Sequence, residues 1–218
     1  MNQEAFLPGV KDAERRGARR RGLFLTVAKL VFDCDEQVCI VRDISETGAL
    51  VQTFADISED RLVALELSSG YRVEVQSAWK QGNRTGLAFS TSVDLHAFLA
   101  RKQPNGRRQP RFRIQCAADV RSGLTNRSAT VMDISQFGAL IQCDQLLLID
   151  EVVSLDLKFW RPIFAKVRWR RGSHFGLIFE ETFLLEQLAS LLISISSRRN
   201  LIAQPAQNEV LTHESGRR

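Results

Sequence analysis

The chain has 218 residues, of which 44% are hydrophobic and 25% are charged, a balance that excludes wholesale disorder. No apolar run reaches the roughly 18 residues of a membrane span. Residues 1–11 lack the apolar segment of a signal peptide, so we expect a soluble, cytoplasmic protein without membrane insertion. The formal net charge of +5 is concentrated in two arginine clusters, at 11–21 and 101–113. The rest of the chain is acidic on balance, which argues against a general polyanion binder.

The sequence contains an internal repeat. The segment VRDISETGALVQ at 41–52 returns as VMDISQFGALIQ at 131–142, an offset of 90 residues, and the two arginine clusters recur at nearly the same offset. Two copies of one domain follow from this repeat, each of ordinary size for a small domain. We place the domains at 12–102 and 103–197, with a flexible C-terminal tail at 198–218.

In chain order, the first copy contains six short segments with the pattern of strands, at 23–32, 37–43, 48–53, 61–67, 71–80 and 84–90. In YRVEVQSAW, for example, Val73 and Val75 alternate with polar residues, which indicates a half-buried antiparallel strand. Six short strands without long helices between them predict a closed barrel. A helical pattern follows each barrel, near Leu95 and from Leu184 to Leu192, and we expect each helix to pack on its own barrel.

The predicted fold is therefore all-β, with two tandem six-stranded antiparallel barrels, each followed by a helix. Trp79 and Trp169 hold the same position in the two copies. At these repeated strand positions we expect them in the barrel cores, with contact to a ligand as the alternative.

Two motifs recur together. RGARR at 16–20 and RRQPR at 107–111 fit RxxxR, and DISETG at 43–48 and DISQFG at 133–138 fit DxSxxG. A tryptophan and a GLxF strand follow in both copies. In these motifs the chain resembles a tandem of two PilZ domains, over residues 12–197. The resemblance implies a six-stranded antiparallel barrel and, as the ligand, the bacterial second messenger cyclic di-GMP (c-di-GMP).

The residue chemistry suits this ligand. Guanidinium groups pair with phosphate oxygens and with guanine O6 and N7, and they stack on bases. An aspartate can accept hydrogen bonds from guanine N1–H and N2–H, which adenine lacks. The serines can bond the ligand or only close the local turn, and the glycines would allow a positive φ or a close backbone approach. The candidate ligand-binding residues are Arg15, Arg16, Arg20, Asp43, Ser45 and Gly48 in the first copy and Arg107, Arg111, Asp133, Ser135 and Gly138 in the second.

The two copies differ just before the arginine motif, where the first has Arg15 and the second has Gly106. In the family, an arginine there often accompanies a stacked pair of ligand molecules, so we hypothesise two molecules at the first site and one at the second. Residues 103–111 are both the interdomain linker and the second arginine arm. Ligand binding is therefore expected to change domain orientation and to signal to a protein partner, with outputs such as motility, exopolysaccharide or biofilm control implied by the resemblance.

No catalytic constellation, metal-ligand spacing or cofactor-binding motif is found, so we predict a non-enzymatic effector. The cysteines at 34, 39, 116 and 143 are expected to be buried, reduced thiols. The main alternative is a small β-barrel protein that binds RNA or single-stranded DNA. The presence of only one Tyr and three Trp, two of which (Trp79 and Trp169) hold core-like positions, counts against it. Another alternative is a tandem in which one degenerate barrel is a protein-docking module.

Overall fold

The computed structural model describes residues 25–33, 35–57, 62–68, 70–95 and 109–203. The strands of the first half are β1 (Thr26–Phe32), β2 (Glu36–Ile44), β3 (Gly48–Thr53), β4 (Leu62–Leu67), β5 (Arg72–Gln81) and β6 (Arg84–Phe89). Those of the second half are β7 (Phe112–Ser122), β8 (Thr125–Ile134), β9 (Gly138–Gln142), β10 (Val152–Asp156), β11 (Ile163–Arg171) and β12 (His174–Phe179). Helix α2 (Leu185–Ala203) follows the last strand.

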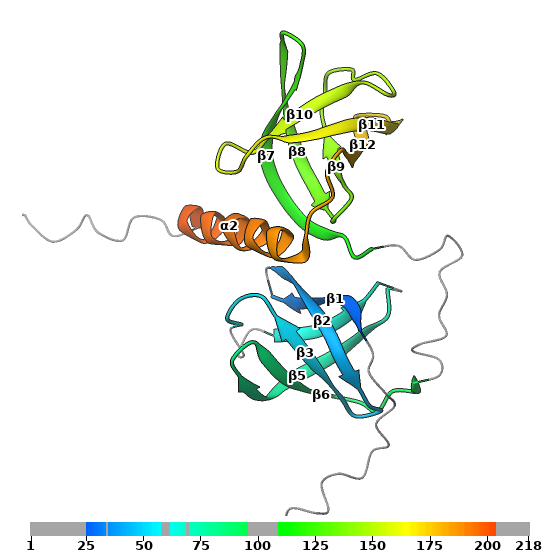
Figure 1. The fold of residues 1–218 in the computed structure, drawn as a ribbon, viewed down its shortest axis with the longest axis vertical. Helices are drawn as coiled ribbons and strands as arrows, with labels where there is room; N and C mark the ends of the chain where they lie inside the picture. Colours follow the sequence, from blue (N-terminus) through cyan, green and yellow to red (C-terminus); the bar gives the residue numbers. More distant parts are fainter. Residues whose placement is uncertain (1–24, 34, 58–61, 69, 96–108, 204–218) are drawn as a thin grey trace, which may run out of the picture.

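Each set of six strands forms a closed barrel (Figure 1), in the order β1-β2-β3-β6-β5-β4 and β10-β11-β12-β9-β8-β7. All neighbouring strands are antiparallel, and each ring is closed where its first strand meets its fourth, as in the pairs Leu30↔Leu65 and Leu155↔Val120. The predicted all-β fold with two six-stranded barrels is confirmed. Closure leaves neither barrel with an open sheet edge.

The strand pattern explains the cores. In β5, Val73 and Val75 are buried, whereas Arg72, which precedes them, and Glu74, which lies between them, are exposed. Because successive side chains in a strand point to opposite faces, this alternation fills the barrel with aliphatic groups and leaves charges in water. In the second barrel, Val167 lies fully buried in the same way.

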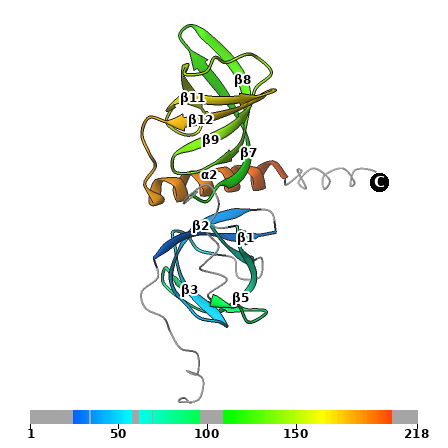
Figure 2. The ribbon, with the colours of Figure 1, turned by 90° about the vertical axis from the view of Figure 1, so that its right-hand side faces the viewer.

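Helix α2 lies between the two barrels in both views (Figures 1 and 2), and it contacts β2 of the first barrel as well as β7 of the second. Val38 of the first barrel belongs to the hydrophobic core of the second, with Val27 and Phe54 packed against it. The helix thus packs on its own barrel, as expected, and in addition against the first barrel, which was not expected. The buried side chains of the helix form one stripe at helical spacing, made of Leu188, Leu191, Leu192 and Ile195, and the buried Ala189 widens it.

The helix runs to Ala203, six residues beyond the predicted end of the second domain at 197. Arg199 explains part of this extension, because its guanidinium pairs with Asp35 of the first barrel at 3.3 Å. The remainder of the predicted tail, 204–218, lies outside the described residues. The helix predicted after the first barrel also lies outside them from residue 96 onward.

The cysteines agree in part with the expectation. Cys39 and Cys143 are buried free thiols, whereas Cys116 is only half-buried, and Cys34 lies outside the described residues. Burial raises the pKa of the Cys39 thiol. Across the described parts of the chain, no helix has the length and apolar character needed to cross a membrane.

Candidate functional site

The two DxSxxG motifs form the same turn. In the first copy the Ser45 amide donates to the Gly48 carbonyl at 2.8 Å and the Ser45 hydroxyl donates to the same oxygen at 3.2 Å. In the second copy the Ser135 amide and hydroxyl make the same two bonds to the Gly138 carbonyl, at 2.8 and 3.2 Å. Ser135 is buried. In this geometry the serine hydroxyl closes the turn, which is the structural one of its two anticipated roles.

The motif glycines are needed for close approach of two strands. A Cβ atom at Gly138 would lie 2.1 Å from the carbonyl oxygen of Leu177, and one at Gly48 would lie 2.4 Å from that of Leu87. Neither motif glycine has a positive φ. Of the two roles anticipated for the motif glycines, the structure therefore shows the close approach of two backbones and not a positive φ.

The second motif carries an exposed ion pair. Arg111 Nε donates to Asp133 Oδ1 at 2.6 Å, with 47% of the arginine side chain and 20% of the aspartate side chain exposed. A charge-assisted bond of this length holds the arginine arm against the turn. In the first copy, Asp43 Oδ1 accepts a hydrogen bond from the Ile44 amide at 2.9 Å. Arg15, Arg16, Arg20 and Arg107 lie outside the described residues, so the structure brings together Arg111, Asp133, Ser135 and Gly138 in the second copy and Asp43, Ser45 and Gly48 in the first.

Trp79 and Trp169 do not lie in the cores, and that prediction is wrong: they are 48% and 46% exposed. A β-bulge explains the difference. The register of β5 against β6 shifts between Ser77 and Trp79, and that of β11 against β12 shifts between Val167 and Trp169. Because a bulge inserts one extra residue, it reverses the in–out alternation and turns the following tryptophan outward.

Each tryptophan lies over a glycine of the neighbouring strand. A Cβ atom at Gly176 would lie 2.0 Å from Trp169 Nε1, and one at Gly86 would lie 2.2 Å from Trp79 Nε1. A glycine inside a strand opposite a large aromatic residue was the sequence signal for this arrangement.

A transverse row of residues connects the tryptophan with the motif aspartate. In the second barrel, Trp169 pairs with Gly176, Gly176 with Leu140, and Leu140 with Asp133. Three strand spacings of about 4.8 Å put Asp133 and Trp169 roughly 14 Å apart along this row. The first barrel has the same row, from Trp79 through Gly86 and Leu50 to Asp43. An indole face and a carboxylate are thus presented on one side of each barrel.

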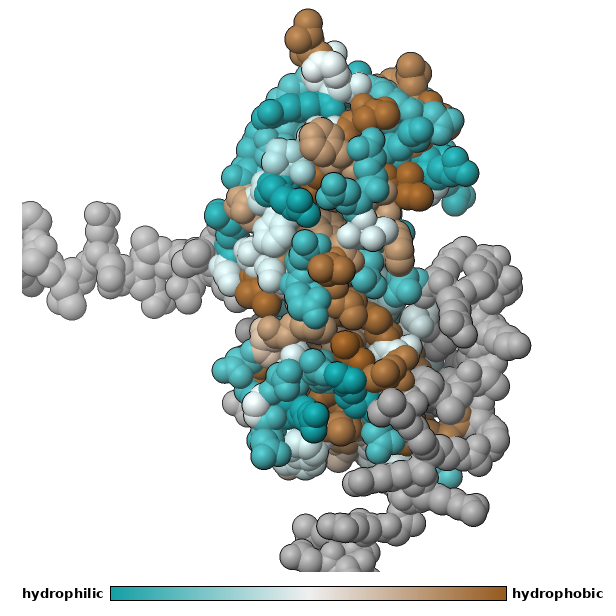
Figure 3. Space-filling model, in the orientation of Figure 1, coloured by the Kyte–Doolittle hydropathy of each residue, from teal (hydrophilic) through white to brown (hydrophobic). Residues whose placement is uncertain are grey.

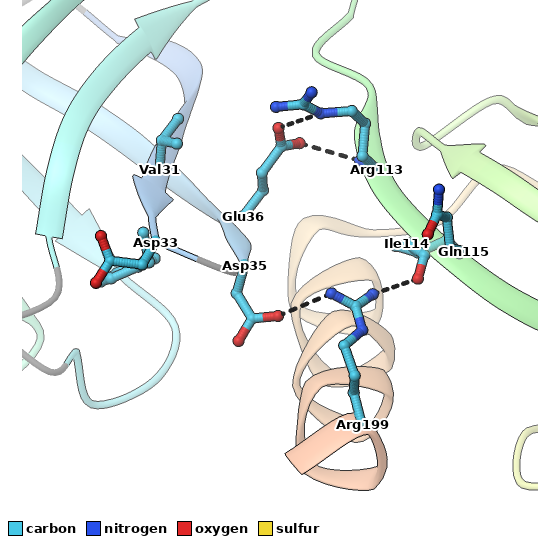
Figure 4. Close-up of a pocket in the computed structure, with 9 residues that line it drawn as sticks. Val31, Asp33, Asp35, Glu36, Arg113, Ile114, Gln115 and Arg199 are labelled. Carbon is cyan, nitrogen blue, oxygen red and sulfur yellow. Dashed lines mark hydrogen bonds and ion pairs between the residues drawn. The ribbon is translucent and has the colours of Figure 1, made fainter. Parts of the chain in front are cut away.

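Strand β7, which begins directly after Arg111, also joins the two barrels (Figure 4). Glu36 of the first barrel accepts hydrogen bonds from the Arg113 amide and from Arg113 Nε, both at 3.0 Å. Arg199 of α2 bonds both the Ile114 carbonyl and Asp35. These residues border a cavity of about 290 Å³. In the register of β7 against β8, Arg113 lies opposite Asp133. The junction between the barrels therefore begins beside the DxSxxG motif.

The backbone at this junction is unusual. Gln115 has a φ of 44° and lies in the bulge between Arg113 and Cys116. A residue other than glycine is uncommon in this region of φ. The long-range partners of Arg113 and Arg199 had no local sequence signal, since they are 77 and 164 residues away in the chain.

Comparison with known proteins identifies the second barrel. Residues 105–194, which include all six strands of the second barrel, match the family model of the PilZ domain. The first barrel has the same strand order and the same turn, which is consistent with a tandem of two such domains. No curated protein matches the chain.

Three solved structures are among those to which this chain is similar. PlzA of Borreliella burgdorferi in complex with c-di-GMP is 13% identical, with 78% of this chain and 87% of that chain covered and a TM-score of 0.33. YcgR of Escherichia coli in complex with c-di-GMP is 14% identical, with 81% and 85% covered and a TM-score of 0.30. The Bacillus subtilis inhibitor of motility MotI/DgrA is 14% identical, with 84% and 98% covered and a TM-score of 0.30.

Proposed function

We propose that this protein is a non-enzymatic receptor for c-di-GMP. The observation that carries the proposal is the exposed Arg111–Asp133 pair beside a DxSxxG turn, in the part of the chain that matches the PilZ domain. Among the described residues, no cluster of three or more His, Cys, Asp or Glu side chains could hold a metal ion. The site chemistry is that of recognition, with a cation, a carboxylate and an aromatic face on one surface.

Each group has a specific role in the proposed complex. Asp133 accepts the N1–H and N2–H donors of a guanine, which selects guanine over adenine. Arg111 pairs with a phosphate or with the O6 and N7 edge of a guanine, and Arg107 adds a second guanidinium. Trp169, outward-facing on the same row, offers a stacking surface for a base. Ser135 and Gly138 hold the turn in shape. In the first copy the same roles fall to Arg15, Arg16, Arg20, Asp43, Ser45, Gly48 and Trp79.

Ligand binding is proposed to alter how the barrels are oriented. Arg111 lies at the site, just before β7, and Arg113, two residues further on in β7, bonds Glu36 of the first barrel. A ligand that draws Arg111 away from Asp133 would move the start of β7, and with it the Arg113 and Ile114 contacts. This supports an effector whose signal is domain geometry, read by a protein partner. Small-angle scattering with and without ligand tests this step, and identical curves at saturation would contradict it.

Calorimetric titration of the full chain with c-di-GMP tests the proposed ligand. We expect saturable binding with a stoichiometry of three per chain, two at the first site and one at the second, and no binding of GTP. A stoichiometry near one would contradict the paired ligand at the first site. Arg16→Ala and Arg107→Ala, compared with each other, would show whether one barrel is a docking module only.

Nucleic-acid binding is a second candidate, because Trp169 is exposed and is flanked by the exposed Arg168 and Arg170. Stacking platforms beside cations are the usual means of binding single strands. The expected core positions of Trp79 and Trp169 counted against nucleic-acid binding, but both tryptophans are about half exposed. Affinity for a short RNA that falls steeply with salt would support it, whereas selective, weakly salt-dependent binding of c-di-GMP would exclude it as the main function.

A further inference from the structure

An exposed apolar patch lies on the second barrel. It consists of Phe137, Phe164, Ile178 and Leu184, which are 45%, 57%, 48% and 64% exposed. Hydrophobic surface is visible on this barrel as well as at the junction of the two barrels (Figure 3). Single exposed apolar residues are normal, but a contiguous group on a soluble domain usually marks an interaction site.

Backbone contacts place the four residues in adjoining segments. Ile178 pairs with Gly138, the residue after Phe137, and the Phe179 amide donates to the Phe137 carbonyl at 2.9 Å. The Glu180 amide donates to the Phe164 carbonyl at 2.9 Å, which puts Phe164 diagonally beside Ile178 on the outer face. The Phe183 amide donates to the Gln136 carbonyl at 2.9 Å, so Leu184 adjoins the same loop.

The first barrel shows that the fold does not require these apolar groups. At the offset of 90 residues, the corresponding positions hold Thr47, Glu74, Ala88 and Asp94. Their backbones are placed equivalently, since Phe89 donates to the Thr47 carbonyl at 2.9 Å and Ser90 to the Glu74 carbonyl at 3.0 Å. The apolar patch is therefore specific to the second copy, and packing of a barrel does not account for it.

The rim of the patch carries both charge signs. Arg161 and Lys166 lie on the side of β11, and Glu180 and Glu181 lie at the end of β12, all four exposed. Arg161 and Glu181 are only loosely paired, at 3.8 Å. A two-fold axis through the patch would set the basic side of one copy against the acidic side of another, which makes the surface self-complementary.

The size of the patch also suits a second copy. Four side chains, each about half exposed, present on the order of 400 Å² of apolar surface. One side of a standard interface buries about 800 Å², of which about 60% is apolar. A groove of about 150 Å³ beside the patch, lined by Pro162, Phe164 and Phe183 among others, is large enough to admit an apolar side chain.

We propose that the apolar patch joins two copies of this chain in an isologous dimer. The proposal does not rest on the proposed ligand, although Phe137 lies within the DxSxxG turn at 133–138. Sedimentation velocity over a range of concentrations tests it, using the full chain without ligand. We expect a reversible monomer–dimer equilibrium. Sedimentation as a monomer at every concentration, or a larger open assembly, would overturn the proposal.

Variants can be taken from the first barrel, where the same backbone accepts the polar residue. Phe164→Glu copies Glu74 and Leu184→Asp copies Asp94, and each is expected to weaken dimerisation by about tenfold or more. Leu148→Ser is the matched control, because Leu148 is 63% exposed on the same barrel but outside the patch. Equal effects of Phe164→Glu and Leu148→Ser would contradict the proposal, and circular dichroism verifies that each variant is folded.

Charge exchange tests the two-fold arrangement itself. Lys166→Glu and Glu180→Lys are each expected to weaken the dimer, because each places like charges opposite one another. The double variant restores the opposite pairing and is expected to dimerise as the wild type does. A double variant weaker than both single variants would contradict the isologous pairing.

Discussion

Removal of the Glu36 carboxylate is predicted to destabilise the protein far more than removal of its partner Arg113. Glu36 is 7% exposed, and it accepts bonds from Lys29 Nζ at 3.4 Å and from the amide and Nε of Arg113 at 3.0 Å. The Lys29 side chain is itself 9% exposed, whereas that of Arg113 is 75% exposed. The carboxylate thus neutralises a buried cation and bonds the neighbouring barrel.

The magnitude follows from these contacts. Breaking a buried ion pair costs about 3–5 kcal/mol, but Lys29 retains Glu66 at 2.8 Å, which reduces that loss. The orphaned Arg113 amide adds about 1 kcal/mol or more. We expect Glu36→Ala to lower the free energy of unfolding by about 3 kcal/mol, and Arg113→Ala by less than about 1 kcal/mol, because an exposed ion pair contributes little.

Urea denaturation of the full chain measures the difference. Trp79 is the only tryptophan before the second barrel, so its fluorescence, in a variant in which Trp160 and Trp169 are phenylalanine, follows the first barrel. Scattering is expected to show a larger radius of gyration for Glu36→Ala, because the junction loses its bridging carboxylate. Equal and small effects of the two substitutions would refute the role assigned to Glu36 at the junction.

Three further predictions concern single positions. Gly138→Ala should destabilise the second barrel by about 1–3 kcal/mol in thermal denaturation, because its Cβ would meet the Leu177 carbonyl at 2.1 Å; an unchanged melting temperature would contradict this. Thr85→Val should stabilise the first barrel by about 1 kcal/mol, because Thr85 Oγ1 is buried without a hydrogen-bond partner among the described residues; a destabilised variant would indicate the opposite. Lys158 bonds Asp119 and lowers the pKa of that carboxyl, so this contribution to stability is present above the pKa of the unfolded chain and is lost as pH falls through the folded pKa. Lys158→Ala should therefore flatten the loss of stability between about pH 5 and pH 2, and an acid denaturation profile parallel to that of the wild type would contradict it.

The fold could be predicted because its pattern is local. Alternation such as that of Val73 and Val75 with charged neighbours identifies each strand, and the repeat doubles every signal. The tryptophans were misplaced because alternation was extended through a β-bulge, which no periodicity reveals. Gly86 and Gly176 were the sequence signal that could have corrected this prediction, because each leaves room for a tryptophan of the neighbouring strand to lie over the outside of the barrel.

The motif residues of the candidate site could be identified from the sequence, but their surroundings could not. Asp133 and Arg111 were identified from motifs, and the structure places them in contact. The junction beside them depends on Glu36 and Arg199, which meet the second barrel only through tertiary packing of α2 against β2. Pairings between residues so distant in the chain leave no periodic trace in the sequence.

Titration of the full chain with c-di-GMP, compared with a matched pair of variants, tests the proposed receptor most directly. Asp133→Ala removes the carboxylate of the second motif, and Asp144→Ala removes an exposed carboxylate elsewhere on the same barrel. Calorimetry is predicted to show saturable binding for the wild type, affinity at the second site reduced by about tenfold or more for Asp133→Ala, and no change for Asp144→Ala. The absence of heat with the wild type, or identical isotherms for the two variants, would contradict it.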